Sequence, residues 1–89
     1  MVIVKVFGTL GLDLGQNEFE LDLAGGTLAN VIDQMTSRYG VKVKEELLDE
    51  KGNLDYAYGI FSNEERVADL TTQIQDGAEL VIVNMVGGG

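Results

Sequence analysis

The fold of this chain is decided by its last stretch, Glu79-Leu80-Val81-Ile82-Val83-Asn84-Met85-Val86-Gly87-Gly88-Gly89. Four consecutive apolar residues, from Leu80 to Val83, lack the alternation of a half-exposed strand and predict a central strand that is covered on both faces. The stretch continues without a stop signal into three glycines. Ordering three glycines would cost roughly 3 to 6 kcal/mol, because glycine loses more backbone freedom than any other residue. We therefore expect a folded domain over residues 1–86 and a flexible tail over residues 87–89.

The glycine tail has two interpretations. Terminal glycines are ordinarily a frayed end or a cloning remnant. Here they continue the most apolar strand and close the sequence, which favours a functional tail. A partner with a channel too narrow for any Cβ atom would bind the backbone and the terminal carboxylate. From Val83 to Gly89 an extended chain reaches at most roughly 20 Å, enough to enter a deep active site on another protein.

Composition limits the size of the protein and the kinds of partner it can have. The 89 residues are enough for one small domain, and the formal net charge of −9 argues against nucleic acid and anionic membrane surfaces as partners. Partners with basic patches are favoured instead. The sequence contains no apolar run of transmembrane length and no signal-peptide pattern, so we expect a cytoplasmic protein. Cysteine and histidine are absent, which removes thiol nucleophiles, imidazole bases and the usual zinc ligands, and we expect no metal site.

The N-terminal part predicts a hairpin. Residues 2–7 are mostly β-branched and form a strand whose core face carries Val2, Val4 and Val6. Residues 8–16 contain three glycines and predict a loop. Residues 18–23 alternate between carboxylates and the apolar Phe19, Leu21 and Leu23, which indicates a strand with one wet face. The short connection predicts that the two strands pair antiparallel.

One helix is predicted over residues 28–39. Gly25-Gly26 breaks the preceding strand, Thr27 caps the helix, and Gly40 ends it in the left-handed αL conformation. One apolar stripe with helical spacing faces the sheet and consists of Leu28, Val31, Ile32, Met35 and Tyr39.

The pattern between residues 41 and 78 is weaker. It predicts, in order, a helical turn at 45–49, a turn at 50–53, a strand at 56–61, a turn at 62–65, a return strand at 66–68, a polar turn at 69–76 and the Asp76-Gly77 turn. The terminal strand then lies parallel beside the first strand. The whole order predicts an α+β fold of the β-grasp (ubiquitin-like) type, a mixed sheet packed on one main helix.

The face of the sheet away from the helix predicts a contact surface. Ile3, Phe7, Val81 and Val83 form an apolar patch there, with Lys5 at its margin. Scattered surface apolarity is the ordinary alternative. Including the tail, the residues predicted to bind partners are Phe7, Val81, Val83, Met85, Val86 and Gly87.

Several motifs together resemble the MoaD/ThiS family of ubiquitin-like sulfur carriers. The motifs are Val4-Lys5-Val6-Phe7-Gly8-Thr9-Leu10, Thr27-Leu28, Arg38-Tyr39-Gly40, Glu45-Glu46-Leu47-Leu48-Asp49, Asp76-Gly77-Ala78-Glu79-Leu80 and Val86-Gly87-Gly88-Gly89. The length and the long segment after the helix are similar to the MoaD type, the small subunit of molybdopterin synthase. Two positions depart from the family. Asn84-Met85 stands where prolines are common, and Gly11 where an arginine is common.

The resemblance implies a mechanism for the tail. In the family, a ubiquitin-activating-type enzyme adenylates the terminal glycine carboxylate with ATP, and the product becomes a thiocarboxylate that donates sulfur. In the MoaD type the acceptor is a pterin precursor on the large synthase subunit. Gly88 and Gly89 match the family's Gly-Gly, so Gly89 carries the reactive carboxyl. The chain would bind no cofactor itself, since the activating partner holds ATP and metal.

Three other functions stay open at this stage. The chain could be a protein modifier joined through Gly89 to lysines on targets, a thiamine-type sulfur carrier, or a β-grasp binding module with an inert tail. As a sulfur carrier, the chain would be the substrate-like, non-catalytic small subunit of a sulfur-transfer synthase, with no catalytic side chain of its own.

Overall fold

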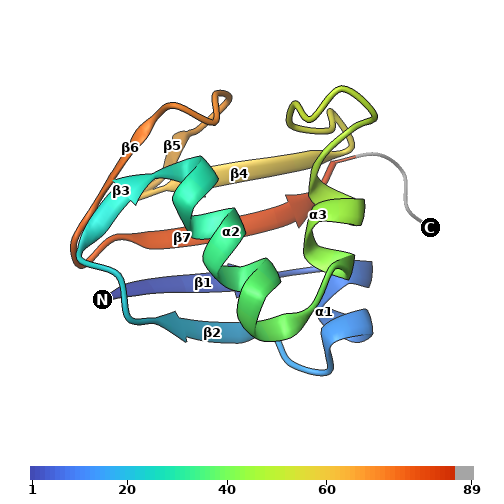
Figure 1. Ribbon diagram of the computed structural model, residues 1–89, viewed down its shortest axis with the longest axis horizontal. Helices are drawn as coiled ribbons and strands as arrows, with labels where there is room; N and C mark the ends of the chain where they lie inside the picture. Colours follow the sequence, from blue (N-terminus) through green and yellow to red (C-terminus); the bar gives the residue numbers. More distant parts are fainter. Residues whose placement is uncertain (86–89) are drawn as a thin grey trace.

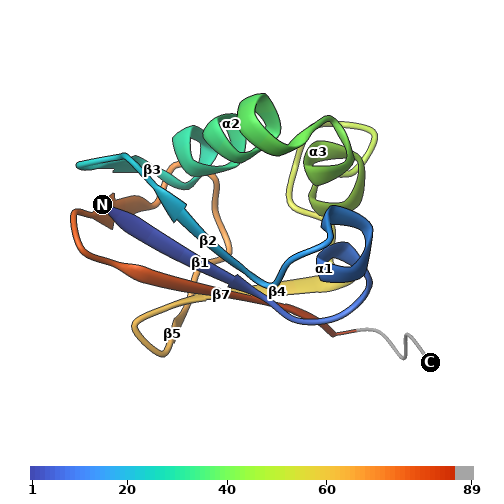
Figure 2. The same ribbon diagram turned by 90° about the horizontal axis from the view of Figure 1, so that it is seen from below.

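A computed structural model describes residues 1–85 and shows two layers, a five-stranded sheet and the helices that cover one of its faces (Figures 1 and 2). The sheet has the strand order β2-β1-β7-β4-β5, and β3 pairs with β6 in a separate two-stranded sheet. The elements are β1 (Val2–Val6), α1 (Thr9–Leu14), β2 (Glu18–Leu21), β3 (Gly25–Thr27), α2 (Leu28–Tyr39), α3 (Lys42–Leu47), β4 (Tyr58–Ser62), β5 (Glu65–Arg66), β6 (Gln73–Gln75) and β7 (Glu79–Asn84).

The strand pairing confirms the predicted topology. β1 pairs antiparallel with β2, as expected for the hairpin, and parallel with β7, with Ile3 opposite Glu79 and Lys5 opposite Val81. β7 pairs antiparallel with β4 on its other side. β7 is therefore the central strand, and the mixed sheet with one main helix is the predicted α+β, β-grasp arrangement.

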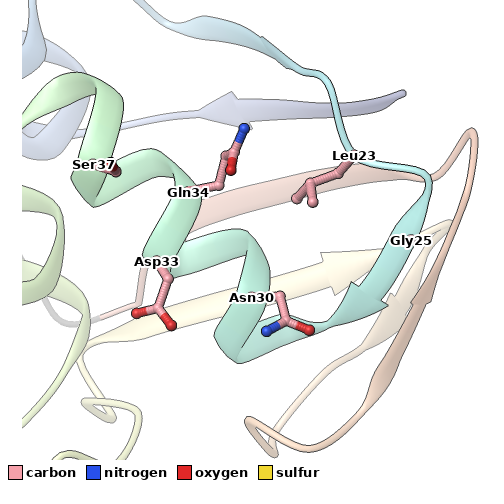
Figure 3. A pocket seen from close by; sticks show the side chains of 6 residues that line it. All are labelled: Leu23, Gly25, Asn30, Asp33, Gln34 and Ser37. Atoms are coloured by element: carbon pink, nitrogen blue, oxygen red, sulfur yellow. The ribbon is translucent and has the colours of Figure 1, made fainter.

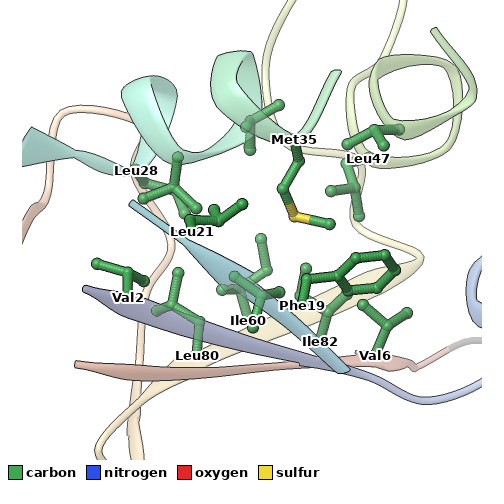
Figure 4. Packing of buried hydrophobic residues seen from close by; sticks show 14 of the residues in the cluster. Val2, Val6, Phe19, Leu21, Leu28, Met35, Leu47, Ile60, Leu80 and Ile82 are labelled. Atoms are coloured by element: carbon green, nitrogen blue, oxygen red, sulfur yellow. The ribbon is translucent and has the colours of Figure 1, made fainter. Parts of the chain in front are cut away.

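The core lies between the sheet and α2 (Figure 4). Val2, Val4 and Val6 are fully buried, as their alternation in β1 predicts. They meet the apolar stripe of α2, of which Leu28, Val31, Ile32 and Met35 are buried. Each such side chain contributes about 1.5 to 3 kcal/mol through burial.

The helix α2 begins and ends almost as predicted. Thr27 is its N-cap: the Oγ1 of Thr27 accepts from the Asn30 amide at 3.2 Å, and the Thr27 amide donates to Asn30 Oδ1 at 2.9 Å. This reciprocal pair satisfies two backbone groups at the helix start. The prediction for Gly40 is wrong in one respect, because its φ of 111° and ψ of 166° lie outside the αL region. That conformation still favours glycine. The glycine therefore indicated the end of the helix correctly, although its backbone conformation differs from the predicted one.

The prediction that β7 is covered on both faces is also wrong. Leu80 and Ile82 are buried, whereas Val81 and Val83 are only partly buried. Figure 2 shows the reason, because the helices all lie on one side of the sheet. β7 is central among its neighbours but covered by helices on one face only.

Two segments that were expected to be loops contain regular structure. α1 lies within the predicted loop 8–16 and buries Leu10 completely. Gly25 and Gly26 do not end the strand region but form β3, which pairs with β6 inside the predicted polar turn 69–76. The pairing is close, because a Cβ atom on Gly25 would lie 2.9 Å from the carbonyl oxygen of Ile74. The glycines thus allow a strand contact that their usual role as strand breakers obscures.

The segment from residue 41 to residue 68 matches its prediction in part. The expected helical turn at 45–49 overlaps the helix α3, which begins three residues earlier and ends two residues earlier than predicted, and the expected strand at 56–61 begins two residues later as β4. β4 and β5 form a two-residue hairpin in which Asn63 and Glu64 both have positive φ, at 49° and 76°. Such a turn follows the twist of paired strands. The return strand covers Glu65–Arg66 rather than residues 66–68.

Candidate functional site: the open sheet face and the end of β7

The face of the sheet opposite α2 carries a central apolar region, which we call the open face. It consists of Ile3, Phe7, Phe61, Val81 and Val83, from β1, β4, β7 and the residue that follows β1. Strand alternation places these side chains opposite the buried ones. Phe7 is 54% exposed, and the other four are partly buried. The four residues predicted for this patch therefore do share one face.

Phe61 is a member of the open face that the sequence analysis did not assign. It lies in β4 directly opposite Val81, so their side chains are cross-strand neighbours. The pattern Tyr58-Gly59-Ile60-Phe61 contained the signal. Tyr58 and Ile60 are buried on the core side, and alternation then places Gly59 and Phe61 on the other side.

Charged side chains lie among the apolar ones rather than only around them. Lys5 was predicted at the margin, but it lies beside Val81, its partner in the strand register. Its Nζ atom is 3.3 Å from Glu79 Oε2 and 4.0 Å from Glu18 Oε1. The one cation on this part of β1 is thus held between carboxylates of β2 and β7, and the surplus of charge there stays negative.

The open face continues to the end of β7. The Met85 amide donates to the Ala57 carbonyl oxygen at 2.6 Å, one step beyond the last paired residues of β7 and β4. Met85 is 49% exposed. The other predicted tail residues, Val86, Gly87, Gly88 and Gly89, lie outside the described residues.

A polar hollow lies elsewhere, on the outer side of α2 (Figure 3). Its volume is about 420 Å³, and its lining consists of Leu23, Gly25, Asn30, Asp33, Gln34 and Ser37. Asn30 is already engaged in the N-cap of α2, and Asp33 Oδ1 contacts Lys44 Nζ at 2.8 Å. Two of the polar side chains that line the hollow, Asn30 and Asp33, therefore already have structural partners.

Other features of residues 1–85 are structural in character. Burial raises the pKa of the Tyr58 hydroxyl, and the charge of Glu46, whose Oε1 is 3.5 Å away, raises it further. Within this part of the chain, no cluster of three or more acidic side chains is arranged to hold a metal ion. None of its helices combines the length and apolarity needed to cross a bilayer.

The mixed sheet packed on one main helix defines a class by its fold, the ubiquitin-like β-grasp proteins. No family model matches the sequence, and no curated protein matches it either. Solved structures do match. CysO of Mycobacterium tuberculosis is 28% identical over 97% of this chain and 100% of that one, with a TM-score of 0.81. A chain of the BexX/CysO complex of Amycolatopsis orientalis is 26% identical over all of both chains, with a TM-score of 0.82.

Two further structures broaden the comparison. SAMP1 of Haloferax volcanii is 21% identical over 99% of this chain and 98% of that one, with a TM-score of 0.83, a likeness that concerns the fold. A candidate molybdopterin converting factor subunit 1 from Pyrococcus furiosus is 26% identical over 96% of this chain and 97% of that one, with a TM-score of 0.73. The predicted resemblance to ubiquitin-like sulfur carriers is thus confirmed at the level of fold. These structural neighbours support the interpretation of this chain as a ubiquitin-like sulfur carrier or modifier.

Proposed function

We propose that this protein is a sulfur carrier whose Gly89 carboxylate is adenylated, converted to a thiocarboxylate and used as a sulfur donor in molybdopterin biosynthesis. The observation that carries the proposal is the position of β7. This strand is central in the sheet, contributes Val81 and Val83 to the open face, and is followed in the sequence, after Met85, by Val86-Gly87-Gly88-Gly89. A docked partner on the open face would thereby lie close to Met85, from which the chain continues into the glycines.

The chemistry requires activation because a carboxylate is a poor electrophile. The Gly89 carboxylate oxygen attacks the α-phosphorus of ATP, and pyrophosphate leaves as the acyl adenylate forms. A hydrosulfide-level sulfur nucleophile then attacks the carbonyl carbon, and AMP leaves with the former carboxylate oxygen. The product is a thiocarboxylate, formed without a change of oxidation state. Sulfur can be carried in this way by a chain that contains no cysteine.

We propose two partners for the open face, an adenylating enzyme of the ubiquitin-activating type and the large subunit of molybdopterin synthase. The BexX/CysO complex supports the idea that proteins of this fold assemble with partner proteins. The Pyrococcus furiosus structure supports the molybdopterin pathway through its description as a converting factor subunit. In this scheme the adenylating enzyme holds ATP and its metal ion, and the reactions take place in the cytoplasm.

A second candidate function is protein modification through an amide bond between Gly89 and a target lysine. The similarity to small archaeal modifier protein 1 (SAMP1) favours it, and SAMP1 of Methanosarcina acetivorans is 27% identical with a TM-score of 0.76. The two functions share the adenylate and differ in the nucleophile that attacks it.

The mass of the tail tests the proposal. With the ubiquitin-activating-type enzyme of the same organism, ATP and sulfide, the protein should gain about 16 Da at Gly89, the difference between sulfur and oxygen. Deletion of Gly89 moves the carboxyl back by roughly 3.5 Å, and Gly88→Val adds a branched side chain to a segment proposed to enter a narrow channel. Both variants should keep the parent melting temperature and gain no mass.

Two outcomes would change the conclusion. A parent protein that forms neither adenylate nor thiocarboxylate would leave only the binding-module function. Adducts on lysines of other proteins, in place of the thiocarboxylate, would make the modifier function the better one.

A further inference from the structure

Gly59 has a backbone conformation that does not require glycine. It lies in β4 opposite Val83, on the open face of the sheet. Its backbone φ angle is not positive, so this conformation is open to any residue. A glycine inside a strand weakens it, because it loses backbone entropy and packs no side chain. The reason for glycine here must therefore be space rather than conformation.

The space beside Gly59 is filled by another residue. A Cβ atom on Gly59 would lie 2.9 Å from both Cγ and Sδ of Met85, and 3.2 Å from Cε1 of Phe61. Contacts below 3.0 Å are essentially absent for real Cβ atoms. The Met85 side chain thus lies diagonally across the strand pair, over Gly59, and the Phe61 ring borders the same space. Thioether sulfur next to an aromatic ring edge is a favourable contact.

Met85 is consequently held at two points. Its backbone amide donates to Ala57, and its side chain occupies the gap left by Gly59. It is the last described residue before the glycine stretch. Gly89 lies four positions further along the chain, so an extended chain from Met85 reaches at most about 14 Å. The position of Met85 and the direction of its backbone therefore limit the region that the Gly89 carboxyl can reach.

We propose that Gly59, Phe61 and Met85 form a latch that sets the direction in which the chain leaves β7. Gly59 and Met85 are then positioning residues for the activation of Gly89. This inference rests on the proposed function, and it adds which residues of the domain aim the tail. The latch acts before the reaction, by limiting the directions from which the carboxyl approaches the partner's active site.

The latch itself is tested by NMR without any partner. In the parent, the Met85 ε-methyl group should show a nuclear Overhauser contact to the Phe61 ring. Gly59→Ala should remove this contact, because the added methyl displaces the thioether. Met85→Leu, a substitution of similar volume, should keep a methyl contact to the ring. An unchanged Met85 contact in Gly59→Ala would overturn the latch.

The positioning role is tested by ATP–pyrophosphate exchange with the activating enzyme. Gly59→Ala and Met85→Ala should each lower kcat about fivefold, as expected for loss of one soft contact, while KM stays within about twofold because Val81 and Val83 are intact. The double variant should be no worse than either single one, since both changes open the same latch. Met85→Leu should retain most of the parent rate. Melting temperatures should not fall for Gly59→Ala.

The other possible results distinguish whether the latch exists from whether it positions Gly89 for activation. Unchanged exchange in variants that have lost the ring contact would overturn the positioning role. Additive losses would overturn a shared mechanism, and a rise in KM alone would make Met85 a docking contact instead. No exchange by the parent would overturn the proposed function and the positioning role with it, while the NMR contact would still decide whether the latch exists.

Discussion

Lys5 illustrates how one residue sets the character of the open face. Its ammonium group lies between Glu18 and Glu79, at 4.0 and 3.3 Å. Exposed ion pairs of this kind contribute only about 0 to 1 kcal/mol to stability. Their more important effect is on recognition, because Lys5 is neutralised locally and the region beside Val81 presents apolar surface with negative charge around it. A partner that fits this face needs an apolar centre and basic groups at its rim.

Phe7 provides the sharpest test of that surface. It is 54% exposed, so Phe7→Ala removes little buried area and should change the melting temperature only slightly. Loss of an aromatic anchor at an interface should weaken binding to the activating enzyme or the large synthase subunit by about 1 to 3 kcal/mol. Calorimetric titration measures the affinity, and thermal unfolding measures the stability.

Leu12→Ala is a matched control for Phe7→Ala. Leu12 is also exposed, at 80%, but lies in α1 rather than on the open face. It should change neither affinity nor stability. A loss of affinity equal to that of Phe7→Ala would mean that general apolarity, and not the open face, determines binding. A collapse of stability in Phe7→Ala would place Phe7 in the core.

The predictability of the elements depended on how local their signals are. α2 was predictable because its cap, its apolar stripe and its stop residue all lie within 14 consecutive positions, 27–40. β1 and β2 were predictable because alternation is visible within each strand. α1 has no such pattern, since only Leu10 and Gly11 of its six residues are buried. Its position is set by contact of Leu10 with the core.

β3 and β6 could not be derived for a different reason. Each has three residues, and each exists only because the other lies beside it. The same holds for one part of the open face. Alternation within single strands places Ile3, Phe7, Val81 and Val83 there, and also Phe61, whereas the packing of Met85 on Gly59 depends on the register between β4 and β7. Register is a property of two strands together and is not written in either one alone.

Gly25→Ala tests the close pairing of β3 with β6. Gly25 has a φ of 113°, and an added Cβ would lie 2.9 Å from the Ile74 carbonyl oxygen. Backbone strain of this kind costs about 1 to 3 kcal/mol, and the contact adds to it. Gly15→Ala is the control, because Gly15 also has a positive φ, 79°, but an added Cβ would meet nothing within 4 Å. Chemical denaturation should show a clearly larger loss for Gly25→Ala. Equal losses would show that the backbone conformation alone requires glycine.

The molecule as a whole carries a formal net charge of −9, and this charge should steer association. The on-rate for a basic partner should fall as salt screens the carboxylates, while the off-rate changes little. Surface plasmon resonance at ionic strengths from about 0.02 to 0.2 M spans Debye lengths that differ by about threefold. Glu20→Gln, beside Ile3 in the sheet register, should weaken this dependence. An on-rate that is flat across the series would contradict electrostatic steering.

The parallel pairing of β1 with β7 has a consequence for folding during synthesis on the ribosome. β1 is synthesised first, yet its central partner consists of residues 79–84. Synthesis at about 5 to 20 residues per second leaves Val2, Val4 and Val6 without their final neighbours for several seconds. The sheet can therefore close only after residues 79–84 have been synthesised. Folding and the availability of the glycine stretch become linked in time, so a chain that offers its tail to a partner has already had the opportunity to complete its core.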